Sequence, residues 1–253
     1  KGDYKIAEWA VKTLDSKPKG PFFLSAGFFL PHVPCFATEK WFDMHPVDKT
    51  QLAQIKRDDR KDTPRFSWYM HWSLPEPRLR WLEEHNEWMN LTRSYLACTT
   101  FVDAQIGKLM EALERNGFAD NTIVVLWSDH GWHLGEKNHW HKSTLWEEAT
   151  RVPFIIATPG MKQAGQSSSR PVNLVSIYPT LVGLLDLESD IDFDGPDLAP
   201  LLDNPNAAWP HASLIDFGYG NTAVRDEHWR YIRYNDGTEE LYDHQTDPNE
   251  WKN

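Results

Sequence analysis

Residues 122–133 read Thr122-Ile-Val-Val-Leu-Trp-Ser-Asp-His-Gly-Trp-His133, an apolar run that turns polar at Ser128. The run from 122 to 128 is short and rich in β-branched residues, which indicates a buried strand. Two more short apolar runs, 21–27 and 153–158, have the same character. The sequence therefore predicts several buried strands, and the strand over 122–128 ends in a group of ionisable side chains.

Helical periodicity separates these strands. Apolar residues recur every three or four positions in 4–14 and most strongly in 86–117, which Asn116-Gly117 ends. A third helix is expected over 171–187, kinked at Pro179. Because strands and helices alternate, the pattern predicts an α/β fold with flanking helices and parallel strands.

The last fifty residues have a different pattern. Short β-prone runs follow one another closely, and Asn235-Asp-Gly237 is a hairpin signal. The expected strands are 213–217, 222–225, 229–234 and 240–242. We therefore expect an α/β part over residues 1–204 and a small antiparallel C-terminal subdomain over residues 205–253.

Composition excludes several classes of protein. The net charge is −11, from 26 basic and 37 acidic residues, which argues against a nucleic-acid-binding surface. No apolar run approaches the roughly 20 residues of a membrane helix. Two cysteines, Cys35 and Cys98, cannot build a disulfide framework. Cys35 lies near His32, but this spacing does not establish a nucleophile pair, and we expect a packed side chain.

The polar cluster after residue 128 is where chemistry is expected. Ligands bind beyond the carboxyl ends of strands in open α/β sheets. Four of the eleven histidines lie within residues 130–141, and a further polar pair, Pro31-His32, follows the run 21–27. Asp129 and His130 can face one point, and Gly131 permits a sharp turn there. This arrangement predicts a metal site.

The residues alone leave the metal open. Four close histidines suggest zinc, but no standard zinc spacing is present. A hard cation held mainly by carboxylates suits a strand-end aspartate equally well. The cluster offers no second obvious carboxylate, so such a site would be incomplete within this sequence.

Four blocks together resemble the sulfatases of the alkaline-phosphatase-like superfamily, in particular the iduronate-2-sulfatase-like branch. The longest is 128–154, which contains Ser128-Asp-His-Gly-Trp-His133 and Trp140-His-Lys-Ser-Thr-Leu-Trp146. The others are 27–34, 95–107 and 240–250, in the family's order and across nearly the whole chain. The resemblance implies an alkaline-phosphatase-like sheet with flanking helices, of which residues 1–204 are the C-terminal portion.

The resemblance also implies roles for individual residues. Asp129 and His130 would be two ligands of an active-site Ca²⁺. Lys142 would contact the sulfate ester and stabilise charge on the leaving oxygen, and His32 would donate a proton to that oxygen. Both roles suit the chemistry, because breaking the S–O bond places negative charge there. We expect Trp132 and His133 to line the substrate pocket, and we assign no role to His139 and His141.

Three family features are absent from the sequence, and the first is decisive. Sulfatases use a formylglycine made from a Cys/Ser-x-Pro-x-Arg motif, and no cysteine or serine here stands in that motif. The aspartate pair that completes the calcium site and the Lys-x-His segment are also absent. We therefore expect a C-terminal portion that is inactive alone and that receives its nucleophile and remaining Ca²⁺ ligands from an N-terminal half or another chain.

The expected activity is sulfuric ester hydrolysis, on sulfated sugars of the glycosaminoglycan kind. Two alternatives stay open: a phosphoryl or phosphonate ester hydrolase of the same superfamily, and a fragment that only binds a sulfated ligand or a partner chain. No nucleic-acid or membrane partner is expected. The resemblance suggests a periplasmic, secreted or lysosomal protein. An incomplete sheet should also expose a large apolar face.

Overall fold

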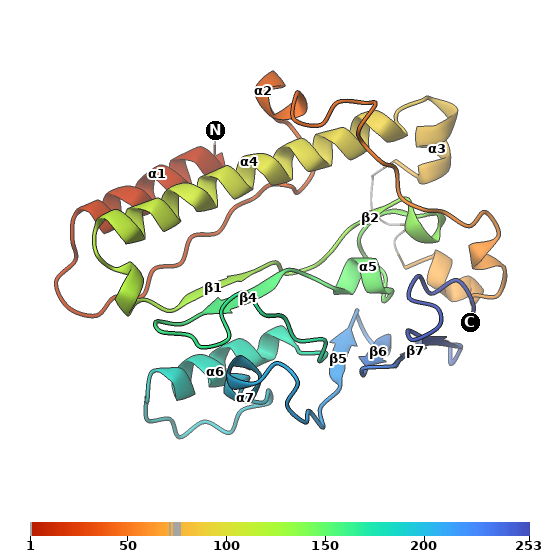
Figure 1. Ribbon diagram of the computed structural model, residues 1–253. Helices are drawn as coiled ribbons and strands as arrows, with labels where there is room; N and C mark the ends of the chain where they lie inside the picture. Colours follow the sequence, from red (N-terminus) through yellow and green to blue (C-terminus); the bar gives the residue numbers. More distant parts are fainter. Residues whose placement is uncertain (1, 71, 73–76) are drawn as a thin grey trace. The chain divides into compact units, whose positions relative to one another are not determined.

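The computed structural model describes residues 2–70, 72 and 77–253 (Figure 1). The chain divides into two compact units, each described here by itself. The first comprises residues 1–53 and 79–123, and the second comprises 54–78 and 124–253.

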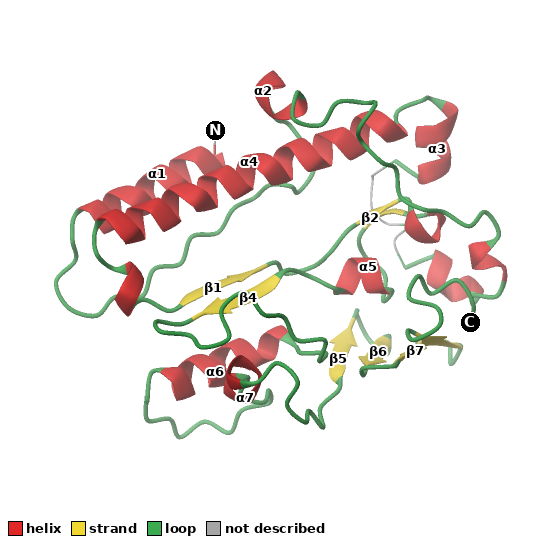
Figure 2. Ribbon diagram, viewed as in Figure 1, coloured by secondary structure: helices red, strands yellow, loops and turns green. Residues whose placement is uncertain are grey.

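Two long helices build the first unit. Helix α1 (Gly2–Asp15) packs along α4 (Trp88–Arg115), as Figure 2 shows. Small and apolar side chains of both helices are buried: Ala7, Ala10, Leu14, Ala97, Cys98 and Ala112. The short helices α2 (Glu39–Phe42) and α3 (Leu79–Glu84) and a 3-10 turn at Ala119–Asn121 complete the unit.

Helix α4 ends where the sequence predicts. Gly117 has a φ of 75°, the left-handed conformation that glycine adopts without steric cost. The Phe118 N–H donates to Leu113 O at 2.9 Å and the Gly117 N–H to Glu114 O at 3.0 Å, a Schellman motif. The helices predicted over 4–14 and 86–117 are confirmed.

The strand predicted over 21–27 is wrong. This run has no regular secondary structure, and its Phe22 ring packs edge-on against Phe118 at 5.4 Å. Apolar, β-prone residues make a strand only where a neighbouring strand accepts their backbone hydrogen bonds. The run has no strand partner within the described residues.

The described residues of the second unit form three small sheets. Strands β1 (Val124–Trp127) and β4 (Phe154–Ala157) pair in antiparallel register from Val124↔Ala157 to Trp127↔Phe154. The expected parallel arrangement is therefore wrong for this pair. A parallel crossover needs a covering helix. Between β1 and β4 the chain instead forms the hairpin β2 (His133–Leu134) and β3 (Trp140–His141), a 3-10 turn (Glu136–Asn138) and the one-turn helix α5 (Glu147–Thr150).

The helix expected over 171–187 is shorter than predicted. A 3-10 turn at Leu174–Ser176 leads into α6 (Ile177–Leu184), and α7 (Ala199–Asp203) follows. Pro179 lies in the first turn of α6, where the missing N–H has no intrahelical partner to lose, so no kink is needed.

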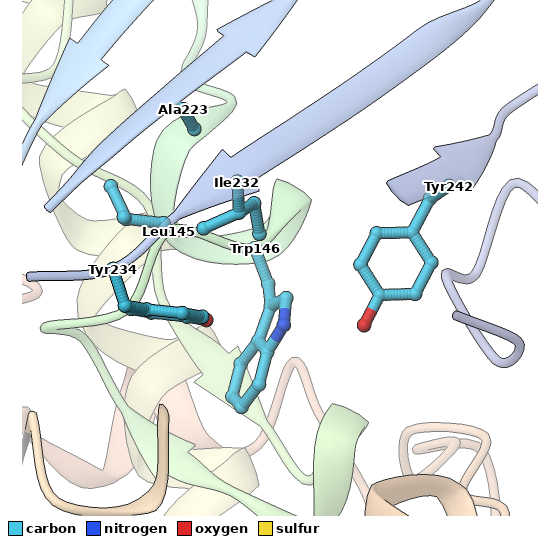
Figure 3. Packing of buried hydrophobic residues seen from close by; sticks show 6 residues of the cluster. All are labelled: Leu145, Trp146, Ala223, Ile232, Tyr234 and Tyr242. Atoms are coloured by element: carbon cyan, nitrogen blue, oxygen red, sulfur yellow. The ribbon is translucent and has the colours of Figure 1, made fainter. Parts of the chain in front are cut away.

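The C-terminal antiparallel sheet is confirmed. Strands β5 (Ser213–Asp216), β6 (Thr222–Arg225), β7 (Trp229–Arg233) and β8 (Glu239–Asp243) pair in sequence order. Its inner face packs against Leu145 and Trp146, as Figure 3 shows. The other members of this core are Ala223, Ile232, Tyr234 and Tyr242. The segment that follows Lys142 is thus held against the C-terminal sheet.

The remainder of this unit is irregular. Residues 54–70 contain two 3-10 turns, Asp59–Lys61 and Arg65–Trp68. Lys137 from the β2–β3 hairpin forms a buried ion pair with Asp59, with Nζ and Oδ1 3.3 Å apart.

Candidate functional site

Asp129 and His130 lie just beyond the carboxyl end of strand β1, and Gly131 follows them. A Cβ at Gly131 would lie 2.1 Å from the backbone oxygen of Glu148 and 2.8 Å from that of Arg151. The Gly131 N–H donates to Ala149 O at 2.9 Å. Glycine is therefore required because two backbone segments approach closely, rather than for the sharp turn that we expected.

Asp129, His130 and Lys142 lie together. His130 Nδ1 is 2.9 Å from Gly131 O, and a carbonyl can only accept, so Nδ1 carries the proton. The other nitrogen, Nε2, is then an acceptor, 3.1 Å from Lys142 Nζ and 3.8 Å from Asp129 Oδ2. The Asp129 side chain is 86% exposed. Three of the residues singled out in the sequence thus form one cluster.

This cluster opens into a cavity within the second unit. Its volume is about 920 Å³, and its lining includes Asp129, His130, Lys142, Arg170, Asn173 and Arg225. The lining also includes the carboxylates of Glu147 and Asp216, and its mixture of charged and polar groups around a space of this size suits a polar ligand.

The donor set fits part of a hard-cation site. Asp129 Oδ2 and His130 Nε2 are close enough to reach one ion at the roughly 2.3–2.6 Å typical of calcium. Calcium takes about six to eight ligands, mostly oxygens, and this cluster supplies one carboxylate. Lys142 donates to the same His130 lone pair that would bind the ion. The residues present are therefore a partial ligand set.

Lys142 is held in a constrained segment. Its neighbours His141 and Ser143 have φ values of 99° and 69°, which are uncommon for residues other than glycine. The Lys142 carbonyl is 3.1 Å from His139 Nε2, and its Nζ lies 6.0 Å from the centre of the Trp132 ring. Such conformations persist where the surroundings impose them, and they cluster at functional sites.

Trp132 and His133 lie in the interior. Trp132 is 8% exposed and His133 is fully buried, with its Nε2 2.9 Å from Thr144 Oγ1. His141 is also buried, and burial together with the charge of Arg78 lowers its pKa to about 4, so its imidazole is neutral. These side chains hold the β2–β3 hairpin around Lys142, and the substrate-lining role expected for Trp132 and His133 stays a prediction.

His32 belongs to the first unit. Its Nδ1 is 2.7 Å from Val33 O, and its ring lies 4.8 Å from the Phe29 ring. The preceding turn is fixed by Asp3, which accepts from the Phe29 and Leu30 N–H groups at 2.8 and 2.9 Å. Sequence reasoning missed Asp3, because Asp3 lies on α1, 26 positions before Phe29. The catalytic role of His32 stays a prediction.

Sequence reasoning also missed a group of charged residues in the second unit, here called the Arg230 cluster: Arg230, Arg225, Glu147, Glu250 and His244. Ligand atoms of Glu147, His244 and Glu250 lie within 4.8 Å of one another, as in a metal site. Arg230 lies among them, with Nε 2.6 Å from Glu250 Oε1, and it also pairs with Glu147. Because guanidinium groups already balance both carboxylates, this group is an ion-pair cluster.

The Arg230 cluster also fixes the segment that follows Lys142. Arg230 Nη1 donates to Leu145 O at 3.0 Å, and the Glu147 N–H donates to Glu250 Oε2 at 3.0 Å. The residues that make these two contacts are 85 and 103 positions apart. No short motif could have indicated them.

Comparison with known proteins identifies the family. The family model described as Sulfatase matches residues 3–187, and the model for the C-terminal region of N-sulphoglucosamine sulphohydrolase matches residues 135–253. The chain belongs to the Sulfatase family. Members of this family generally bind a metal ion, and they include lysosomal, periplasmic and secreted enzymes.

Curated relatives include sulfatases with different substrates. A sulfatase of Formosa agariphila is 38% identical, over 99% of this chain and 49% of that protein. An ulvan-active sulfatase of the same organism is 33% identical, over 99% and 47%. Human iduronate 2-sulfatase is 27% identical, over 74% and 40%. The chain thus spans about half the length of the curated relatives it matches.

Solved structures confirm the alkaline-phosphatase-like sulfatase fold. A protein in complex with its substrate D-glucosamine-2-N,6-O-disulfate superposes with a TM-score of 0.76 at 24% identity, over 99% of this chain and 64% of that chain. The phosphonate monoester hydrolase of Agrobacterium radiobacter gives 0.80 at 22%, over 98% and 55%. No helix in the described part of the chain is both long and apolar enough to span a membrane.

Proposed function

We propose that the protein containing this chain is a sulfuric ester hydrolase that acts on sulfated sugars. The observation that carries the proposal is the contact of Lys142 with His130, beside Asp129 at the end of β1, in a chain of the Sulfatase family. Relatives whose names specify an ulvan-active and an iduronate 2-sulfatase support a sulfated carbohydrate as the substrate class.

In this proposal Lys142 and His32 act on the leaving oxygen. The alkoxide that departs from sulfur carries negative charge, and an ammonium group aimed at it lowers the barrier. His32 would give that oxygen a proton, a step suited to imidazole because it titrates near neutrality. Trp132 and His133 would shape the pocket wall behind Lys142.

Asp129 and His130 would hold the metal, which we propose is Ca²⁺. When bound, the ion would supply positive charge that orients the anionic ester group. The chain offers a partial ligand set, so further oxygen ligands would come from an N-terminal half or another chain. The same partner would bring the formylglycine nucleophile, since no Cys/Ser-x-Pro-x-Arg motif occurs among residues 1–253. We expect residues 1–253 to be inactive alone.

The compartment follows from the same proposal. Family members include lysosomal, periplasmic and secreted enzymes, and we propose one of these locations for this protein. The domain division at residues 204 and 205 likewise stays a proposal.

The test uses the full natural protein, assayed on a sulfate ester and on a phosphonate ester of the same alcohol. Lys142→Ala should lower kcat on the sulfate ester by about 100- to 1000-fold, the usual effect of removing one group that stabilises developing charge. Lys162→Ala, at an exposed lysine of the same unit, is the matched control and should leave kcat unchanged.

Three results would count against the proposal. Equal kcat values for Lys142→Ala and Lys162→Ala would show that Lys142 takes no part in the reaction. A kcat/KM that is higher for the phosphonate ester would favour the phosphonate hydrolase alternative. Binding of sulfated sugar without any turnover by the full protein would indicate a binding role only.

A further inference from the structure

The segment that follows His32 lies along helix α4 in the first unit. The Trp41 ring packs edge-on against Phe101 at 5.7 Å. His45 Nε2 is 2.7 Å from Thr100 Oγ1, and the Arg93 side chain donates to His45 O at 2.6 Å. Three independent contacts thus fix residues 41–45 against the middle of α4.

The two cysteines of the chain meet in this same region. Cys98 lies on α4 between Arg93 and Phe101, and it is fully buried. Cys35 lies in the segment packed on α4 and is half-buried, with its thiol 3.2 Å from Pro31 O. The side chains of Cys35 and Cys98 interact with each other, and Cys35 also lies near Tyr95 on α4. Two thiols in mutual contact need no long-range movement of the backbone to be joined.

We propose that Cys35 and Cys98 form an intramolecular disulfide bond when the protein meets an oxidised thiol compound, and that this bond fastens the His32 segment to α4. A single bridge of this kind differs from the multi-disulfide framework that the cysteine count excludes. His32 is three residues from Cys35, so the bond would act directly on its loop.

The reaction is thiol–disulfide exchange in two steps. The Cys35 thiolate attacks one sulfur of the oxidant, a small-molecule disulfide, and forms a mixed disulfide while the first thiolate leaves. The Cys98 thiolate then attacks the Cys35 sulfur, forms the Cys35–Cys98 bond and expels the second thiolate. Two protein thiols are oxidised and one oxidant disulfide is reduced to two thiols, so atoms and electrons balance.

The order of the two steps follows from accessibility and charge. Cys35 is partly exposed and can meet a solute, whereas Cys98 is enclosed. The interaction of the Cys98 thiol with the Cys35 side chain, together with burial, raises the pKa of Cys98, which makes Cys98 a poor first nucleophile. Cys98 therefore acts as the resolving thiol.

The experiment incubates the natural protein with glutathione disulfide and follows intact mass and peptide maps. The wild type should lose two hydrogens in mass, retain no glutathione and yield a linked Cys35–Cys98 peptide. Its melting temperature should rise by about 5–10 °C, because the bond closes a long loop in the unfolded chain. Addition of dithiothreitol should reverse both changes.

Two single variants separate the steps. Cys98→Ala should retain one glutathione on Cys35, because nothing resolves the mixed disulfide. Cys35→Ala should stay unmodified until the protein is unfolded. Circular dichroism of both reduced variants checks that they are folded, and the wild-type result stands without them.

Several results would overturn the proposal. A wild-type protein that keeps glutathione on Cys35 would show that Cys98 cannot reach it. Two unmodified thiols after incubation would show that Cys35 is not accessible. A linkage between two molecules in place of the internal one would assign Cys35 to intermolecular pairing.

Discussion

Replacing Arg230 by methionine removes the central cation of the Arg230 cluster. Arg230 is 1% exposed, and its guanidinium contacts Glu147, Glu250 and the carbonyl oxygen of Leu145. Methionine keeps an unbranched apolar stem in place of the arginine stem and carries no charge, so Arg230→Met removes the ion pairs while it retains part of the packing.

The expected loss of stability can be worked out from these contacts. Removing one partner of a buried ion pair costs about 3–5 kcal/mol, because the other charge stays buried. The lost hydrogen bond to Leu145 adds about 1 kcal/mol. Arg225 still lies 3.4 Å from Glu147, and His244 lies 2.9 Å from Glu250, so part of the loss is offset. We expect a net loss of about 3–5 kcal/mol, a large share of the roughly 5–15 kcal/mol of a typical protein.

The loss should depend on pH in a defined direction. Burial alone would raise the pKa of Glu147, but the charge and hydrogen bond of Arg230, with Arg225, hold it below its ordinary value of 4.5. A lowered carboxyl pKa stabilises the folded state above pH 4.5, and this contribution disappears as the pH falls through the folded-state value. Without Arg230 most of that contribution is absent, so the difference between wild type and Arg230→Met should shrink on acidification.

The assay is urea unfolding at pH 7 and at pH 4, followed by circular dichroism. Arg233→Met is the matched control, since Arg233 lies three residues along the same strand with its side chain exposed. It should change the free energy of unfolding by less than about 0.5 kcal/mol. A loss below about 1 kcal/mol for Arg230→Met at pH 7, or an equal loss at both pH values, would refute the reasoning.

Two further substitutions test close contacts by thermal and urea unfolding. Gly131→Ala should destabilise the protein by at least about 2 kcal/mol, because its Cβ would lie 2.1 Å from the Glu148 backbone oxygen. Gly107→Ala, on an open face of α4, should instead stabilise it by about 0.5–1 kcal/mol; equal effects at the two glycines would contradict this account. Asp3→Ala should cost about 2–3 kcal/mol by leaving two backbone N–H groups without an acceptor, whereas Glu8→Ala on the same helix should cost under about 0.5 kcal/mol. A loss for Asp3→Ala no larger than that for Glu8→Ala would show that water replaces the carboxylate.

The parts of the fold that were predictable rest on local signals. The apolar stripe of 86–117 and its Asn-Gly stop determine α4 through contacts between near neighbours in sequence. The hairpin at Asn235-Asp-Gly237 is equally local: Gly237 has a φ of 83°, and its N–H donates to Tyr234 O at 2.9 Å. Such elements need little information from the rest of the chain.

Strand pairing was not predictable in the same way. The runs 21–27 and 122–128 look alike in composition, yet only the second forms a strand among the described residues. Pairing depends on which backbone lies alongside, and direction depends on how the chain returns, neither of which hydrophobicity encodes. The antiparallel pairing of β1 with β4 therefore had to come from the structure.

The candidate site shows the same division. Asp129 and His130 are adjacent in sequence, so their convergence could be inferred from a strand end. Lys142 entered through family resemblance, and its 3.1 Å distance from His130 is a property of the hairpin between them. Arg230 and Glu250 were missed because their partners lie far away along the chain.

Residues 250–253 have a consequence for the order in which the second unit assembles. Asn253 donates to Asp62 through its N–H and its side-chain amide, and the Lys56 side chain donates to Trp251 O at 2.8 Å. Asp62 and Asn253 are 191 positions apart in the sequence, and Lys56 and Trp251 are 195 positions apart. A ribosome completes residues 56–62 many seconds before it reaches residue 250, at roughly 5–20 residues per second. Lys137 and Asn138 can pair with Asp59 and Lys56 well before that point, whereas the Lys56 side chain and Asp62 must wait for residues 251 and 253, and until then they are open to chaperones or to mispairing with a neighbouring nascent chain.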